Sequence, residues 1–475
     1  MGQEIGKTQF SASEYETFGQ RLKQETDLLA RWIGEGRCSS LGPVTGFELE
    51  AWLVDSDMNP APANAEFLAA FANPLACPEL ARFNVEFNTE PRRLEGTALS
   101  ELHADLLGLW TQALATAESL GLNLLAIGIL PTVREAMLNL DAISAMNRYR
   151  ALNEQVLAAR RQEPLKLRIQ GREHLEHLHT DVMLEAAATS FQIHLQVPLD
   201  SARAYYNAAL LASAPLVAIS ANSPFLFGKN LWEETRIPLF EQAVETGGYG
   251  GVAHGPLRRV SFGTGYAQHG IAELFEENLR HFPVLLPILS GEAPERLPHL
   301  RLHNGTIWRW NRPLVGFDPD GTPHVRIEHR VIPAGPSIVD MIANAAFYYG
   351  LAESFARERW EQDIAYPWAK DNFYQAARHG LNGLAVGRTG DKARLDAWIL
   401  RELLPLAESG LASLGLAKQD IDYYLGIVER RAATGLTGGE WQRRFIARHP
   451  NDFAALTREY LNRQHTGEPV HQWPM

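Results

Sequence analysis

Cysteine is scarce in this sequence of 475 residues, which contains only Cys38 and Cys77. So few thiols exclude a scaffold held together by disulfides, and they fit a reducing cytoplasm. Neither cysteine has a histidine nearby in the sequence. We therefore expect no catalytic role for either thiol.

Long apolar runs are also missing. A membrane-spanning helix needs about 20 consecutive apolar residues, and the nearest approach, residues 120–130, is too short and contains glycines. The first residues do not show the basic and then apolar pattern of a secretory signal. These absences predict no membrane segment and a cytoplasmic location.

Positive charge is in deficit. Lys and Arg number 44 against 56 Asp and Glu, which gives a net charge of −12. Nucleic-acid binding usually needs a basic surface, so this class of partner is not expected. The hydrophobic content of 45% is that of an ordinary globular protein, and the length suggests about two to four domains.

Three familiar site motifs are absent. The glycine-rich stretch 247–265 lacks the strand before it and the helix after it that a P-loop or a dinucleotide-binding turn requires. A plain flexible loop and a substrate lid both remain open for this stretch. The segment 173–179 is rich in His and Glu but lacks the order His-Glu-x-x-His, and we predict a solvated element there.

What the sequence does contain is four predicted strands, 46–54, 83–90, 191–197 and 325–331, each with polar residues on one face. Side chains alternate across a strand, so the opposite face of each is largely apolar. The polar rows are Glu48 and Glu50; Asn84, Glu86, Asn88 and Glu90; Gln192, His194 and Gln196; and Arg326, Glu328 and Arg330.

A solvated face of an antiparallel sheet would give the same alternation. Two observations favour a functional site. The rows contain no lysine, and Glu48 and Glu50 stand between large hydrophobic residues, which indicates partial burial. A partly buried carboxylate needs a cation or a hydrogen-bond donor beside it.

The acidic residues of these rows are candidate metal ligands. Glu48 and Glu50 project the same way from one strand, which suits hard cations bound by oxygen, and Glu86 and Glu328 complete the set. His194 adds a nitrogen ligand. Since Mg²⁺ takes only one or two protein carboxylates, this many acids imply more than one metal, or a metal and an amine site.

Arginines provide the anion-binding candidates. Arg330 follows Glu328 by two residues on the same face, where a guanidinium can stabilise a transferred phosphoryl group; a salt bridge to a glutamate is the alternative. Arg309 and Arg312 lie in the Trp-rich segment 303–313. They either bind an anion or are solvated residues of a Trp-anchored loop.

A further polar group follows a predicted buried helix. Asn222 and Ser223, with Arg236 beyond them, are candidates for substrate binding, and the alternative is an ordinary helix stop with turn residues.

The order of predicted elements indicates an α+β fold with a mainly antiparallel sheet. Helices are predicted for residues 11–33, 65–72, 98–120, 147–161, 202–219 and 336–356, and a buried strand for 124–129. We expect one catalytic domain over residues 1–360. Residues 361–475 are predicted to be all-helical, either as a separate lobe or packed on the body.

Five segments, taken in order, resemble the type 2 glutamate–cysteine ligases and their carboxylate–amine ligase relatives. They are 46–50, 86–88, 189–194, 220–224 and 326–330, so the resemblance covers about residues 44–350. It implies a glutamine-synthetase-like fold with a curved antiparallel sheet. It also implies ATP with Mg²⁺ or Mn²⁺, and a reaction in which a glutamate side-chain carboxylate is phosphorylated and the acyl phosphate is captured by an amine.

The resemblance also implies roles for single residues. Glu328 and Arg330 would be catalytic, with Arg330 stabilising the phosphoryl group. The metal ligands would be Glu48, Glu50, Glu86, Glu328 and His194; the nucleotide contacts would be His194, Gln192 and Arg312; and the substrate contacts would be Asn222, Ser223 and Arg236.

The sequence departs from the family pattern at Gly128-Ile-Leu-Pro131, where many relatives have Gly-x-His-Pro. This departure leaves the amine open, with cysteine as the family default. The expected partners are small molecules: ATP, glutamate or a similar carboxylate, and an amine. A homo-oligomer is left open.

Two other function classes compete with the ligase. One is a metal-dependent amidohydrolase that uses the same acids to activate water. The other is a non-catalytic protein that binds a nucleotide or an amino acid. The arginine-rich segment 303–313 favours phosphate chemistry over hydrolysis.

Overall fold

A computed structural model describes residues 4–246 and 257–474. Its centre is an eight-stranded sheet with the strand order β11-β12-β8-β1-β3-β2, to which β4 and β5 add by pairing with β1. Every pairing described within this sheet is antiparallel. The strands are β1 (Val44–Val54), β2 (Ala76–Pro78), β3 (Asn84–Asn88), β4 (Arg92–Arg93), β5 (Asn123–Leu125), β8 (Phe191–Gln196), β11 (Asn311–Phe317) and β12 (Pro323–His329). The predicted α+β class is confirmed.

Three two-stranded hairpins lie outside the main sheet. They are β6 (Leu165–Gln170) with β7 (His174–His179), β9 (Phe225–Leu226) with β10 (Lys229–Asn230), and β13 (Leu384–Val386) with β14 (Lys392–Arg394). The hairpin β13-β14 corrects the expectation that everything after residue 360 is helical. Its strands are only three residues long, which is too short for a clear alternating pattern.

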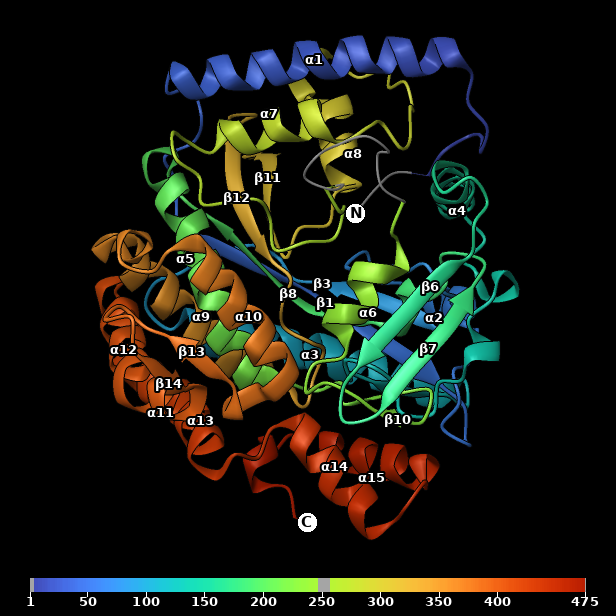
Figure 1. Ribbon diagram of the computed structural model, residues 1–475, viewed down its shortest axis with the longest axis vertical. Helices are drawn as coiled ribbons and strands as arrows, with labels where there is room; N and C mark the ends of the chain where they lie inside the picture. The colour runs from blue at the N-terminus through green and yellow to red at the C-terminus, as the bar shows by residue number, and fades with distance from the viewer. Residues whose placement is uncertain (1–3, 247–256, 475) are drawn as a thin grey trace.

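Helices surround the sheet (Figure 1). They are α1 (Ala12–Gly34), α2 (Asn64–Phe71), α3 (Ala98–Ser119), α4 (Asn147–Ala159), α5 (Leu199–Ser220), α6 (Arg236–Ala243), α7 (Ala272–His281), α8 (Pro298–Gly305), α9 (Ile338–Glu358), α10 (Tyr366–His379), α11 (Leu395–Trp398), α12 (Leu404–Ser413), α13 (Lys418–Thr434), α14 (Gly438–Arg448) and α15 (Phe453–His465). Long α1 crosses one end of the molecule beside α7 and α8, and α14 and α15 lie at the other end (Figure 1).

The predicted helices before residue 360 are confirmed with small changes at their ends. Helix α1 begins at a capping box, where the Glu14 carboxylate accepts from the backbone N–H of Ser11 at 2.9 Å. The predicted buried strand 124–129 is partly wrong. Only Asn123–Leu125 pairs with β1, and the buried residues that follow are not strand.

Helices α5 and α9 form the buried layer behind the sheet. Both are rich in alanine and are buried on nearly all sides over residues 205–220 and 338–352, as expected for helices that are apolar all round. Helix α9 also packs closely on α12. A Cβ at Gly410 would lie 2.0 Å from the carbonyl oxygen of Gly350, so this crossing requires glycine.

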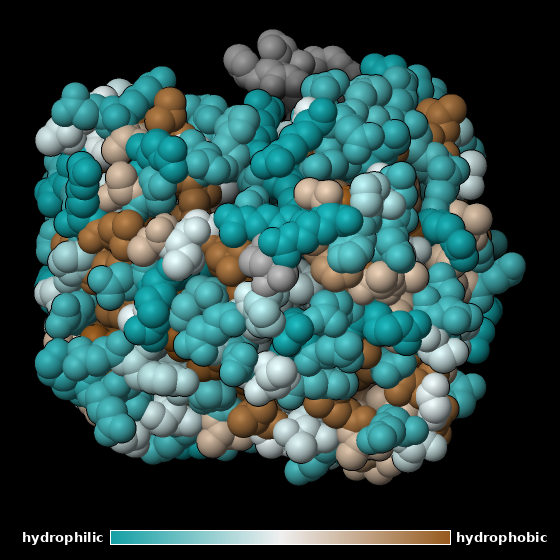
Figure 2. Space-filling model, turned by 90° about the horizontal axis from the view of Figure 1, so that it is seen from below, coloured by the Kyte–Doolittle hydropathy of each residue, from teal (hydrophilic) through white to brown (hydrophobic). Residues whose placement is uncertain are grey.

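The residues after 360 pack on the body rather than standing apart. Phe347 of α9 and Ala407 of α12 belong to one hydrophobic core, and the buried Arg431 of α13 pairs with Asp340 of α9. The boundary at residue 360 stays a prediction. Among the described residues, no helix has both the length and the apolar character needed to cross a membrane. The face seen in Figure 2 is mainly hydrophilic, with hydrophobic residues scattered over it.

Candidate active site

The strand register explains why the polar rows meet. Residues on neighbouring antiparallel strands face each other in fixed pairs. Across the sheet, Glu50 is opposite Glu86 on β3, and His194 on β8 is opposite Glu328 on β12. The four strands that carry the polar rows belong to one sheet.

Two groups of side chains result, each with ligand-type atoms within 4.8 Å of one another. The first, which we call the histidine cluster, contains Glu48, His194 and Glu328. The second, the glutamate cluster, contains Glu50, Glu79 and Glu86. The predicted acids and the predicted histidine therefore come together, divided between two clusters.

In the histidine cluster, His194 lies between the two carboxylates. Its Nε2 atom is 3.1 Å from Glu48 Oε1 and 3.7 Å from Glu328 Oε1. Glu48 Oε2 is buried and has no hydrogen-bond partner in the structure. Burial opposes the charge of Glu48, but His194 beside it keeps the pKa of this carboxyl below its usual value.

Glu328 is held by two guanidiniums. Arg312 donates to both carboxylate oxygens at 2.8 Å, and Arg330 donates to Oε2 at 3.0 Å. Burial opposes the charge of Glu328, yet Arg312 and Arg330 keep its pKa well below the usual range. Arg312 is therefore buried and paired, which excludes the solvated loop considered for it. Arg309 is likewise paired, with Glu277 at 2.5 Å.

Arg330 also connects the two clusters. It lies one residue beyond the end of β12, which stops two residues before the end of the predicted strand 325–331, but its side chain still reaches Glu328. Its Nη1 donates to Gln192 Oε1 at 2.6 Å, and the Gln192 amide donates to Glu50 at 2.9 Å. The Nε atom of Arg330 is buried and without an acceptor, so one donor is free for an anion.

The glutamate cluster places three carboxyl groups close together. Glu50 accepts from the Ser190 backbone N–H at 2.7 Å, and Glu86 accepts from Asn88 at 2.9 Å. Burial raises the pKa of Glu50 to about 7, against the opposing charge of Arg330. Burial also raises the pKa of Glu79 well above its usual value, and the charge of Glu86 adds to this effect.

These observations fit bound divalent cations. Glu48 Oε2 and Glu86 Oε2 are buried oxygens without partners, and a nearby positive charge would stabilise them. Glu50 and Glu79, whose pKa values are raised, would also gain from a bound cation. An oxygen-rich donor set is the one that Mg²⁺ and Mn²⁺ prefer.

Sequence reasoning missed three residues of this region. Glu79 lies between β2 and β3, where no periodic pattern points to it. Glu185, in a short 3-10 helix before β8, is buried enough to raise its pKa to about 8, helped by the charge of Glu50. Arg326 was part of a polar row but had no role assigned; its Nε donates to Nδ1 of His194 at 3.1 Å.

The residues predicted to contact substrate, Asn222, Ser223 and Arg236, are buried. Asn222 and Ser223 are fully buried, and their side chains bond to Tyr460 and Glu234. Arg236 donates to Glu234 and to the carbonyls of residues 330 and 331. These polar groups already have protein partners, and of the three residues Arg236 is the one that contacts residue 330. Their substrate roles stay a prediction.

Several other sequence features lie outside both clusters. Cys77 Sγ donates to Glu86 at 3.2 Å, and burial raises the pKa of this thiol strongly, which agrees with the absence of a nucleophilic role. The segment 173–179 forms β7, with exposed His174 and Glu176 and with His179 bonded to Asp181 at 2.7 Å. The glycine-rich stretch 247–265, for which a flexible loop and a lid were both left open, falls largely on residues 247–256, outside the described residues.

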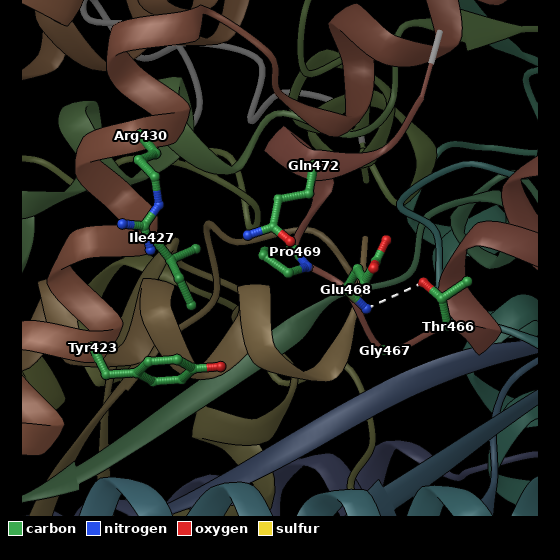
Figure 3. Close-up of a pocket in the computed structure, with 8 residues that line it drawn as sticks. All are labelled: Tyr423, Ile427, Arg430, Thr466, Gly467, Glu468, Pro469 and Gln472. Atoms are coloured by element: carbon green, nitrogen blue, oxygen red, sulfur yellow. Dashed lines mark hydrogen bonds between the residues drawn. The ribbon is translucent and has the colours of Figure 1, made fainter.

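A surface cavity of about 270 Å³ lies elsewhere, between α13 and the C-terminal residues. Figure 3 shows Tyr423, Arg430 and Gln472 around it. None of its lining residues belongs to either cluster.

Known proteins were matched by sequence and by structure. The model of glutamate-cysteine ligase family 2 matches residues 44–469, well beyond the expected range of 44–350 and through the C-terminal helices. No curated protein matches the chain.

Two solved structures share the fold. The glutamate–cysteine ligase of Francisella tularensis in complex with AMP is 12% identical, covers 90% of each chain and has a TM-score of 0.57. A bifunctional glutathione synthetase from Pasteurella multocida is 13% identical, with a TM-score of 0.54; the match covers 92% of this chain and 54% of that one.

The structural match shows that this chain has the fold of a solved glutamate–cysteine ligase. The family match supports ATP and a divalent metal as cofactors and small molecules as substrates, and it lends no support to the amidohydrolase. The chain belongs to glutamate-cysteine ligase family 2 and is an ATP-dependent carboxylate–amine ligase.

Proposed function

We propose that this ligase joins the side-chain carboxylate of glutamate to the amino group of an amino acid, with cysteine as the first candidate. The observation that carries this proposal is the position of Arg330. It bonds to Glu328 of the histidine cluster and, through Gln192, to Glu50 of the glutamate cluster. A phosphoryl group between the two clusters would meet a guanidinium and cation-binding carboxylates together.

The reaction has two steps. A carboxylate oxygen of glutamate attacks the terminal phosphorus of ATP, which forms an acyl phosphate and releases ADP. The amine then attacks the acyl carbon, an amide bond forms, and phosphate leaves while the nitrogen loses a proton. Both steps become faster when the reacting groups are held in position and when nearby groups stabilise charge on the phosphoryl oxygens.

Carboxylates from both clusters are the proposed metal ligands. Glu48 and Glu328 would contribute from the histidine cluster, and Glu50, Glu79 and Glu86 from the glutamate cluster. Mg²⁺ or Mn²⁺ held there neutralises phosphate charge and polarises the phosphoryl oxygens. His194 would contact either a metal or a phosphate oxygen.

The proposed roles of Arg330 and Arg312 depend on direct hydrogen bonds rather than on a bound metal. The free Nε–H of Arg330 would donate to an oxygen of the transferred group, and Arg312 holds the Glu328 carboxylate that orients Arg330. Because Arg330 is buried, its charge acts in a medium of low polarity, where it counts for more than in water.

Gln192, Asn222, Ser223 and Arg236 would shape the nucleotide and substrate positions around Arg330. A cytoplasmic location fits the two free cysteines and the need for ATP. A homo-oligomer is compatible with this function.

The test is ADP release in the presence of Mg²⁺, with glutamate offered against a panel of amines that includes cysteine. Release that depends on both substrates would establish the pair and name the amine. Release with glutamate alone would mean that the acyl phosphate forms and is hydrolysed, with the true amine missing from the panel. No release with any pair would contradict glutamate as the carboxylate.

A further inference from the structure

Two histidines of strand β7 lie side by side on the face of the strand that is turned into the protein. Side chains alternate across a strand, so His177 and His179, two residues apart, project the same way. Their side chains are only 9% and 7% exposed, whereas His174 and Glu176 on the other face are exposed. The segment 173–179 therefore has one solvated face and one covered face.

The facing nitrogens of the two rings are at the separation that a shared metal ion requires. His177 Nε2 and His179 Nδ1 are 3.4 Å apart. A zinc ion binds imidazole nitrogens at about 2.1 Å in tetrahedral geometry, which places two such ligands about 3.4 Å from each other. The strand thus holds both nitrogens where two ligands of one ion would stand.

The outer nitrogen of each ring is held by a carboxylate. His177 Nδ1 lies 3.0 Å from Glu135 Oε2, and His179 Nε2 lies 2.7 Å from Asp181 Oδ1. Histidines that bind a metal almost always use their other nitrogen in this way, which fixes the orientation of the ring. The Asp181 carboxylate is itself oriented by the backbone N–H of Met183, which donates to Oδ1 at 2.8 Å. Both rings therefore aim their remaining nitrogens at one point.

The surroundings of the pair favour a cation at that point. Glu135 and Asp181 contribute two negative charges, which a divalent ion would balance. Across the hairpin, the partners of the two histidines are Leu167 and Leu165, which bring no charge. The hairpin β6-β7 lies on the outside of the molecule (Figure 1), and the exposed Glu135 side chain borders the pair on the solvent side.

We propose that His177 and His179 bind a divalent transition metal ion such as Zn²⁺, with Glu135 and Asp181 as the groups that orient the two rings. Imidazole nitrogen suits Zn²⁺ and its neighbours, whereas Mg²⁺ takes oxygen ligands. In the described part of the chain, no third protein ligand joins these two nitrogens, so water completes the coordination. The site shares no residue with the histidine cluster or the glutamate cluster and does not depend on the proposed function.

The first test uses Zn²⁺ as the probe and counts the ions bound per chain in equilibrium dialysis. The wild type should bind one ion more than His177→Gln and one more than His179→Gln. His174→Gln, on the exposed face of the same strand, is the matched control and should bind as many ions as the wild type. The difference between variants cancels any zinc held by the two carboxylate clusters. Equal zinc content in the wild type and both variants would overturn the proposal and leave only a hydrogen bond between the rings.

The orienting carboxylates give a second measurement. Glu135→Gln should weaken zinc binding by about tenfold, as expected when a metal-binding histidine loses the carboxylate behind it. Glu176→Gln, which removes a carboxylate from the exposed face of β7, should leave the affinity unchanged. An affinity equal to that of the wild type in Glu135→Gln would overturn the role assigned to Glu135.

The position of the ion is measured by anomalous diffraction from crystals soaked in Zn²⁺. A peak about 2.1 Å from both His177 Nε2 and His179 Nδ1 is expected, and an ion bonded to only one ring would overturn the pairing. If His179→Gln does not fold, His177→Gln carries the comparison. None of these measurements uses ADP release, so this site and the proposed function can fail separately.

Discussion

Arg312 on β11 and Glu328 on β12 face each other across the outer strand pair of the sheet, and the guanidinium donates to both carboxylate oxygens at 2.8 Å. Such a two-point contact between buried groups fixes the direction of the carboxylate as well as its charge. Glu328 is in turn the carboxylate that holds Arg330.

Glu328→Gln should therefore affect both arginines. We expect kcat/KM for ADP formation to fall by about 10²–10³-fold, because an amide no longer carries the charge that orients Arg330. The protein should still fold, as followed by circular dichroism. The exposed Glu276→Gln, which breaks only a surface pair on α7, is the matched control. Near-normal turnover in Glu328→Gln would show that the site lies elsewhere.

Arg330→Met should lower kcat by about 10³-fold, since an arginine that stabilises a transferring phosphoryl group is worth this much or more. Arg330→Lys should recover part of the loss because it restores the charge but not the planar donor set. The exposed Arg280→Met on α7 serves as the control for losing a guanidinium. The measurement is ADP release at saturating substrates, and equal losses in the Met and Lys variants would argue against a direct contact with phosphate.

Glu79→Gln tests the residue of the glutamate cluster that sequence reasoning did not find. If Glu79 helps to hold a cation, the Mg²⁺ concentration needed for half-maximal activity should rise by about tenfold. Activity at saturating Mg²⁺ should recover to a large extent. Glu95→Gln, at an exposed carboxylate paired with Arg93, should leave the Mg²⁺ dependence unchanged. An unchanged dependence in both variants would remove Glu79 from the metal site.

His303 should make the fold sensitive to acid. Burial lowers the pKa of His303 from 6.5 to about 4, and its Nε2–H donates to the carbonyl of Asn278 at 3.1 Å. Between these two pKa values the unfolded chain binds a proton that the folded protein does not. The contribution is therefore fully present above pH 6.5 and is lost as the pH falls toward 4, by about 3 kcal/mol.

The measurement is the free energy of unfolding of the wild type and of His303→Gln at several pH values. Other groups titrate in the same range, so the difference between the two proteins is the quantity of interest. This difference should shrink as the pH falls from 7 to 4. A constant difference over that range would contradict a buried neutral His303.

Arg431→Met should reveal how firmly the C-terminal helices are joined to the body. Arg431 of α13 is buried and donates to Asp340 at 2.6 Å and to Asn344 at 2.7 Å, both on α9. Removing it leaves Asp340 charged and buried, which costs about 3–5 kcal/mol. The neighbouring Arg430→Met, at an exposed position, is the control. We expect one unfolding transition at a lower denaturant concentration; a wild-type transition in Arg431→Met would contradict the role of the pair.

Part of the site could be predicted because strands impose a period of two. Glu48, Glu50, Glu86, His194 and Glu328 stood out as polar residues on strands whose other face is apolar, and the sheet brings them together. This alternation identifies residues only within strands, so it does not point to residues in the segments between strands. Glu79 and Glu185 lie outside regular strands, and their burial depends on segments distant in the sequence that cover them.

Strand β11 and the bonding partners of the predicted substrate residues could not be predicted, because both depend on contacts with other segments. Strand β11 directly follows Trp308-Arg309-Trp310 and contains Pro313 and Gly316, which are uncommon in strands, and it is a strand because β12 supplies its hydrogen-bond partners. Asn222, Ser223 and Arg236 carry the residue types of a binding site, but their donors and acceptors are used by Glu234, Tyr460 and backbone carbonyls.

The sequence by itself determined the class of fold, the polar face of the sheet and the acidic and basic residues from which a phosphoryl-transfer site is built, because these follow from local alternation and side-chain chemistry. Tertiary structure alone decided the division into two clusters and the pairing of Arg312 with Glu328. The physical reason is that register and burial arise from contacts between distant segments. The same carboxylate or imidazole acts differently according to which donor, acceptor or charge the fold places beside it.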